Sequence, residues 1–161
     1  MSDPLVILQE IDPAGQDPVL AKMLLVEYAE SLGFSLCFQQ FDEELEGFPG
    51  KYSRPEGNFW LARVDDSLAG CIALRPYGDG TAEMKRLYVR PGFRGHRLGT
   101  RLTKTVIDYA RKAGYSALRL DTEREKMREA QAIYKRLGFV ERDPYYEADS
   151  IDLVFYEKPL T

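Results

Sequence analysis

A basic, glycine-bearing segment in the middle of the chain holds the residues best suited to bind an anion. Gly95 and Gly99 follow the apolar run Leu87–Val89 and precede a long amphipathic pattern. Glycine lets a backbone approach a ligand closely, and the first N–H groups of a helix are unpaired donors at the positive end of its dipole. Positive charge gathers there on Arg94, His96, Arg97 and Arg101. The segment Arg94–Thr100 is therefore a candidate diphosphate site.

The spacing of these glycines limits what the segment binds. It is neither the GxxxxGK[ST] of a Walker loop nor the GxGxxG of a dinucleotide fold, so the bound group need not be a nucleoside triphosphate. Glycine-rich turns between a strand and a helix are also common without a ligand. The glycines then serve turn and packing roles, and the arginines form a solvated helix start.

The elements around this segment form a strand, helix and strand unit. Alternating apolar residues predict a strand over residues 82–89. From Leu98 the apolar residues fall on one helical face until Gly114, which predicts a helix, and residues 117–121 read as the next strand. Such a unit normally joins two parallel strands by a right-handed crossover.

The rest of the chain predicts further strands and helices in one domain, residues 1–161. Strands are expected at residues 5–10, 59–64, 69–74 and 151–157, with helices from Pro18 to Gly33 and over 128–137. Residues 34–46 read as a helical hairpin or loop. With 44% hydrophobic residues in 161, the fold class is α/β (mixed α+β), a mostly antiparallel sheet of about six to seven strands flanked by about four helices.

Composition excludes several classes of function. A net charge of -4 gives no reason to expect nucleic acid or a membrane surface as partner, and suits a cationic or neutral substrate slightly better. The single histidine, His96, leaves little for a histidine-built metal site or a Ser-His-Asp triad, so no metal is expected. Cys37 and Cys71 read as reduced core residues. Residues 1–4 have no basic start followed by an apolar run, so we expect a cytoplasmic protein.

Two motifs resemble those of the GCN5-related N-acetyltransferase (GNAT) superfamily. Arg94 and Gly99 match the ends of its coenzyme A signature, [Q/R]-x-x-G-x-[G/A], while Arg97 replaces the middle glycine. Residues 130–139 match the A-x-x-x-Y-x-x-x-G-F helix end of the family. The order of elements also agrees over nearly the whole chain. Two motifs in the right order are more specific than either one.

The resemblance implies how acetyl-CoA is held. Family members carry a β-bulge that separates the central pair of parallel strands, and the pantetheine arm adds to the opened edge. Apolar residues change parity within residues 82–89, which indicates a bulge near Lys85 to Leu87 or burial of both faces. Leu87 and Val89 are then the pantetheine contacts. The expected cofactor-binding residues are Leu87, Tyr88, Val89, Arg94, Gly95, His96, Arg97, Leu98, Gly99 and Thr100.

The resemblance also implies two catalytic residues. Glu83 occupies the strand position where several family members place a general base, acting directly or through water; the alternative is a solvent-facing strand carboxylate. Tyr134 stands at the position of the family's tyrosine, and a phenol is matched closely enough to a thiol to protonate the departing thiolate. The alternative role for Tyr134 is core packing. Met127 replaces an asparagine that often touches the cofactor in relatives.

The acceptor is expected to be the primary amine of a small molecule, attacked directly without an acyl-enzyme. Phe34, Phe38 and Tyr146 are the expected substrate-binding residues, although aromatic side chains more often pack in a core or loop. The nearby aromatics Phe41, Tyr52 and Tyr145 are further candidates. The acidic residues Asp42, Glu43, Glu44 and Glu46 either attract a cationic amine or form a solvated face. A protein acetyltransferase, a non-catalytic CoA-sensing module and a homodimer paired through the last strands all remain open.

Overall fold

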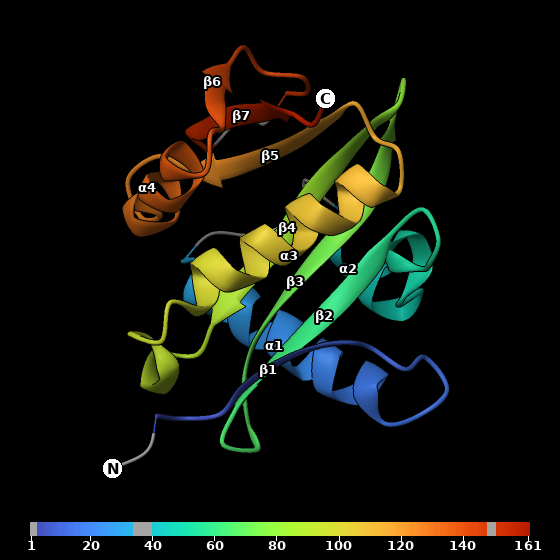
Figure 1. Ribbon diagram of the computed structural model, residues 1–161, viewed down its shortest axis with the longest axis vertical. Helices are drawn as coiled ribbons and strands as arrows, with labels where there is room; N and C mark the ends of the chain where they lie inside the picture. Colours follow the sequence, from blue (N-terminus) through green and yellow to red (C-terminus); the bar gives the residue numbers. More distant parts are fainter. Residues whose placement is uncertain (1–2, 34–39, 148–150) are drawn as a thin grey trace.

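The computed structural model describes residues 3–33, 40–147 and 151–161, which form one mixed sheet with helices on both faces (Figure 1). The strands are β1 (Val6–Glu10), β2 (Asn58–Val64), β3 (Ser67–Gly78), β4 (Thr81–Val89), β5 (Ala117–Glu123), β6 (Val140–Arg142) and β7 (Leu153–Pro159). The α-helices are α1 (Asp17–Ser31), α2 (Phe41–Glu46), α3 (Leu98–Lys112) and α4 (Arg128–Arg136), and the short 3-10 helices are η2 (Gly50–Tyr52) and η3 (Pro91–Phe93).

The sheet has the strand order β1-β2-β3-β4-β5-β7-β6. Strands β1 to β4 form an antiparallel meander, β4 and β5 are parallel, and β5, β7 and β6 are antiparallel again. Helix α3 connects the parallel pair, as the strand, helix and strand unit predicted. The predicted fold class is therefore confirmed.

The parallel pair is hydrogen-bonded only at its start. Thr81–Glu83 pair with Ala117–Arg119, after which the strands diverge (Figure 1). On its other edge β4 keeps its pairing to β3, but the register shifts from Lys85 opposite Ala73 to Tyr88 opposite Cys71. Between these two pairs, Ile72 of β3 faces both Arg86 and Leu87 of β4, which is a β-bulge. Arg86 within it has a φ of 62°, and the predicted change of parity is explained by this bulge.

The two faces of the sheet carry separate apolar cores. On one face, alternate residues such as Trp60, Ile72 and Leu118 pack against α3, which buries its stripe Leu98, Leu102, Val106 and Ala110. On the other face, Phe59, Leu61 and Ala73 pack against Leu24 and Leu25 of α1. Each strand of the centre therefore buries both sets of side chains, and α3 and α1 cover opposite faces.

Three features differ from the elements that the sequence predicts. Strand β3 runs on through Pro76 to Gly78, beyond the strand expected over residues 69–74, and the short edge strand β6 follows Gly138. In the predicted hairpin or loop over 34–46, helix α2 covers its end, while residues 34–39 lie outside the described part. Among the described residues, no helix is long and apolar enough to cross a membrane.

Candidate active site

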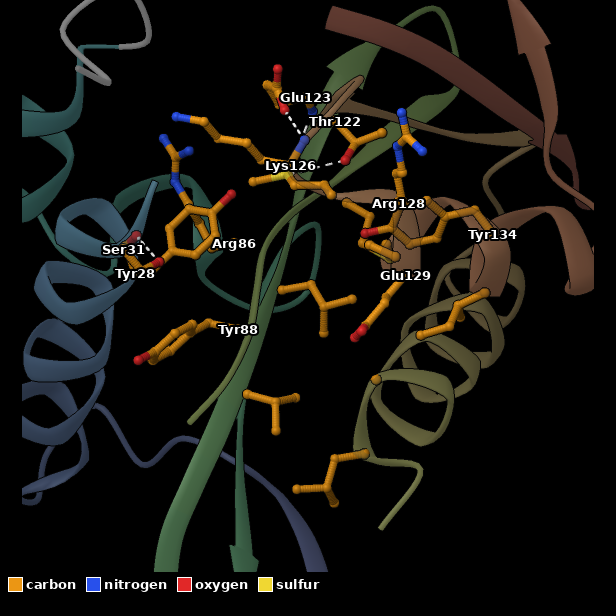
Figure 2. Close-up of a pocket in the computed structure, with 18 of the residues that line it drawn as sticks. Tyr28, Ser31, Arg86, Tyr88, Thr122, Glu123, Lys126, Arg128, Glu129 and Tyr134 are labelled. Atoms are coloured by element: carbon orange, nitrogen blue, oxygen red, sulfur yellow. Dashed lines mark hydrogen bonds between the residues drawn. The ribbon is translucent and has the colours of Figure 1, made fainter. Parts of the chain in front are cut away.

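A cavity of about 660 Å³ opens where β4 and β5 diverge. Its floor is β4 from Met84 to Val89, and its far wall is formed by α4 and the start of α3. Figure 2 shows Tyr28 of α1 and Tyr88 of β4 on one side of this space and Tyr134 of α4 on the other. Within the described residues, the β4 edge that faces the cavity has no strand partner beyond Glu83. Its backbone groups can therefore pair with an extended ligand.

The start of α3 closes one end of the cavity. Arg94, Gly95, Arg97, Leu98, Gly99 and Thr100 line it together with Leu87, Tyr88 and Val89. Nine of the ten residues predicted to bind the cofactor therefore line this cavity. The tenth, His96, is not among the described lining residues. Gly99 allows close helix packing, since a Cβ there would lie 2.9 Å from Cδ1 of Ile133 in α4.

Arg97, which stands where the family motif has a glycine, has a left-handed backbone conformation that favours glycine. It is the N-cap of α3 and has φ 57° and ψ 29°, in the left-handed region. Such a conformation costs an L-residue about 1–2 kcal/mol. The exposed Arg97 side chain adds a cation at the rim of this turn.

Tyr134 belongs to the wall of the cavity and to the core at once. Its ring packs 5.7 Å from Phe139 and 6.2 Å from Tyr156, and only 5% of the residue is exposed. Burial raises the pKa of its hydroxyl well above the usual phenol range. The hydroxyl is therefore protonated at every physiological pH, and the same shift makes it a weaker acid than an ordinary phenol. Tyr134 thus packs in the core, and its role as an acid stays a prediction.

Met127 also lines the cavity, at the N-cap of α4 and about two helical turns before Tyr134. Its sulfur accepts hydrogen bonds from Oγ1 of Thr122 (3.1 Å) and from the backbone N–H of Glu123 (3.4 Å). The thioether thereby ties the end of β5 to the start of α4, in place of an amide side chain.

Glu83 lies beneath the cavity rather than in its lining. Its side chain is fully buried, so the solvent-facing alternative is wrong. The carboxylate accepts hydrogen bonds from Nε of Arg75 (2.8 Å) and from the hydroxyl of Tyr145 (2.6 Å), and Nζ of Lys85 is 4.0 Å away. A fully paired carboxylate of this kind can exchange protons only through its neighbours.

Lys85 and Asp121 face each other at the point where the parallel strands separate. Nζ of Lys85 is 3.6 Å from Oδ2 of Asp121, which also accepts a 2.5 Å hydrogen bond from the hydroxyl of Tyr146. Both line the large cavity. Burial lowers the pKa of the Lys85 ammonium, although the two carboxylates oppose that shift. The sequence analysis missed this pair. The pattern that could have revealed it is a charged residue on the same face of each of two adjacent strands.

A second cavity, of about 330 Å³, lies beside the first. Lys85 lines both cavities and so separates them. The remaining described lining residues are Gln40, Lys51, Arg75, Pro76, Tyr77 and Tyr146. Of the three residues predicted to bind substrate, Tyr146 is therefore placed in this cavity, while Phe34 and Phe38 lie outside the described residues.

The other candidates for the acceptor site serve different roles. Phe41 and Tyr52 are buried in the core beneath α1. Glu44, from the acidic run, receives a bidentate ion pair from the buried Arg86 of the bulge, at 2.8 and 3.0 Å. Instead of attracting a substrate, Glu44 holds α2 against β4. Cys71 is buried with a free thiol, and Cys37 lies outside the described residues. The described residues contain no group of three or more His, Cys, Asp or Glu side chains able to hold a metal ion.

A cavity at diverging parallel strands, closed by a glycine-bearing helix start, defines the acyl-CoA-binding class of transferases that the motifs resemble. Residues 22–139 match the model of the acetyltransferase (GNAT) family, and the chain belongs to that family. An uncharacterized N-acetyltransferase of Schizosaccharomyces pombe is 43% identical over 136 residues, which is 83% of each chain.

Solved structures agree on the fold. A GNAT acetyltransferase from Staphylococcus aureus superposes with a TM-score of 0.77 at 23% identity, covering 98% of this chain and 100% of that one. PaiA N-acetyltransferase from Thermoplasma acidophilum, solved in complex with coenzyme A, superposes with a TM-score of 0.69 at 18% identity over 96% and 99% of the two chains. The family that the two sequence motifs indicated is therefore confirmed.

Proposed function

We propose that this acetyltransferase moves the acetyl group of acetyl-CoA directly onto the primary amine of a small molecule, with both substrates bound at once. The observation that carries the proposal is the continuity of the large cavity. It runs from the basic start of α3 to the Lys85–Asp121 pair, where it meets the second cavity. A donor and an acceptor can thus lie end to end.

The residues of the large cavity fit acetyl-CoA. The backbone at Gly95 and Gly99, with Arg94 and Arg97, suits a diphosphate. The unpaired β4 edge at Leu87 and Val89 suits the amide groups of a pantetheine arm. Bound acetyl-CoA supplies an activated acetyl thioester. Its acyl end then lies at the opposite end of the cavity from the diphosphate, near Lys85 and Asp121.

Tyr134 is the proposed acid. In direct transfer the amine nitrogen forms the new C–N bond, the C–S bond breaks, and the departing thiolate takes the hydroxyl proton of Tyr134. The raised pKa keeps Tyr134 protonated before the thiolate develops and makes it a weaker acid, so a hydrogen bond to the developing thiolate precedes the proton transfer. The phenolate is then reprotonated from solvent or from the amine proton.

The amine proton is proposed to leave through the buried charge cluster at the fork. Among the carboxylates that line the large cavity, Asp121 is the one that pairs with Lys85 at the fork, and 11% of its side chain is exposed. Glu83 lines neither cavity within the described residues, and it can act as base only through Lys85 or Tyr145. Removing the carboxylate that acts as the base should lower kcat by about 10²-fold or more, whereas removing the other should lower it less. Comparing Asp121→Asn with Glu83→Gln separates the two.

The test measures thiol release from acetyl-CoA over a panel of small amines, with the product identified by mass spectrometry. Tyr134→Phe should lower kcat by about 10²-fold or more, with the affinity for acetyl-CoA unchanged. Tyr156→Phe is the matched control, because it removes the hydroxyl of a buried tyrosine that packs beside Tyr134 outside the cavity lining. An unchanged kcat in Tyr134→Phe removes the tyrosine from the chemistry.

The alternatives predict other outcomes in the same assay. A protein acetyltransferase would modify peptides with a lysine or N-terminal amine faster than any small amine. A CoA-sensing module would bind acetyl-CoA and release no thiol with either kind of acceptor.

A further inference from the structure

The smaller cavity is placed where an acceptor must lie. Lys85 lines it as well as the large cavity, at the end where β4 and β5 part. Tyr146 spans the same boundary, since it lines the smaller cavity while its hydroxyl bonds to Asp121 in the large one. A volume of about 330 Å³ is at the lower end of the range for small-molecule sites. It suits a molecule of amino-acid size and is too small for a folded protein surface.

The charge of this cavity is the reverse of the charge of the whole protein. Lys51, Arg75 and Lys85 line it, and among the described residues no acidic side chain does. Glu83 neutralises part of this charge from below, because Arg75 donates to it with Nε at 2.8 Å and with a terminal nitrogen at 2.7 Å. Lys51 is exposed on η2 and lines the same cavity.

Glu83 also fixes the Arg75 guanidinium in place. Arg75 uses two of its N–H donors on Glu83, and 27% of its side chain remains exposed towards the cavity. A guanidinium carries five N–H donors in a planar fork, so the remaining ones can receive a carboxylate. Because the ion pair holds the fork in position, little side-chain entropy is lost when a ligand binds.

We infer that the smaller cavity binds the acceptor and that the acceptor is a primary amine bearing a carboxylate, the amino acids being the smallest members of that class. Arg75 and Lys51 receive the carboxylate, and the amine points past Lys85 towards the acetyl group. The cations also lower the pKa of a nearby ammonium, which favours the neutral amine that attacks. This inference rests on the proposed function for its reaction, but the binding that it predicts is separate from turnover.

The experiment is calorimetric titration of the CoA-saturated protein with the common amino acids and with their amides. Two pairs are compared: L-alanine with L-alaninamide, and L-glutamate with L-glutamine. In each pair the second compound has an amide in place of one carboxylate and keeps the amine. At least one carboxylate should bind about tenfold more tightly than its amide, since each charge-assisted contact contributes that much. The same amino acid should be preferred in the thiol-release assay.

Lys51→Gln should weaken binding of the preferred amino acid by about three- to fivefold, as for an exposed ion pair, and Lys51→Glu should weaken it further. Lys104→Gln, an exposed lysine on α3 outside both cavities, is the matched control and should change nothing. Amides binding as well as acids, no amino acid binding, or Lys51 variants that match wild type would each overturn the inference. Turnover of amines that lack a carboxylate would overturn it while leaving the proposed acetyl transfer intact.

Discussion

The left-handed backbone at Arg97 gives a prediction in which charge and strain can be separated. Arg97→Gly and Arg97→Ala remove the same guanidinium from the rim of the diphosphate site. Only glycine relieves the positive φ of 57°. That relief is about 1–2 kcal/mol, and the greater freedom of glycine in the unfolded chain offsets about 0.5–1 kcal/mol of it. Arg97→Gly should therefore be more stable than Arg97→Ala by about 0.5–1 kcal/mol.

Thermal unfolding and calorimetry of the two variants provide the test. For a domain of this size a change of 1 kcal/mol moves Tm by about 2–4 °C, so Arg97→Gly should melt about 1–4 °C above Arg97→Ala. Both should bind acetyl-CoA about fivefold more weakly than wild type, because an exposed cation contributes up to about 1 kcal/mol to an ion pair. Equal Tm values would show that the turn does not store this strain. If Arg97→Gly bound acetyl-CoA more tightly than wild type, the guanidinium would contribute nothing to diphosphate binding.

Three further predictions concern the strands around the site. A Cβ on Gly70 would overlap a backbone oxygen of β4 beside the bulge. In urea titrations Gly70→Ala should therefore lower the free energy of unfolding by about 1–3 kcal/mol, and it should also weaken acetyl-CoA binding. Wild-type values for both quantities would contradict the close approach of the two strands. Burial alone would raise the pKa of Glu157, but hydrogen bonds from Arg119 and Arg142 hold it below the ordinary 4.5, so its stabilising contribution is complete above that pH and is lost as pH falls through the lower folded value. Glu157→Gln should flatten the acid side of a plot of Tm against pH, and an unchanged slope would count against these pairs. Burial raises the pKa of the Cys71 thiol, so Cys71→Ala should keep the wild-type kcat and single-turnover kinetics should show no acyl-enzyme, whereas loss of turnover in a folded variant would argue for an acyl carrier.

The cofactor half of the site follows from local sequence, and for that reason it could be predicted. The residues Arg94–Thr100 are consecutive, and a strand leading into an amphipathic helix places them on one turn. The change of parity between Met84 and Leu87 indicated either a bulge or burial of both faces, because side chains alternate along a strand, and the structure shows the bulge. What local pattern did not reveal is that Arg97 adopts a positive φ, since arginine has no preference for that conformation.

The acceptor half depends on contacts between distant segments, which explains why the sequence predicts it poorly. Lys85 and Asp121 meet only because β4 and β5 are neighbours in the sheet, and Arg75 joins them from β3. The net charge pointed to a cationic or neutral substrate, whereas the lining of the smaller cavity is basic. Likewise, Glu44 looked like part of a solvated acidic run until its pairing with the bulge residue Arg86 became visible.

The central claim is that the gap between β4 and β5 receives the pantetheine arm while the start of α3 binds the diphosphate. A crystal structure of the protein with acetyl-CoA tests it most directly. We predict the diphosphate against the backbone of residues 94–100, the pantetheine amides bonded to Leu87 and Val89, and the thioester beside Tyr134. Acetyl-CoA bound elsewhere, or absent from crystals and from calorimetry at millimolar concentration, would contradict it.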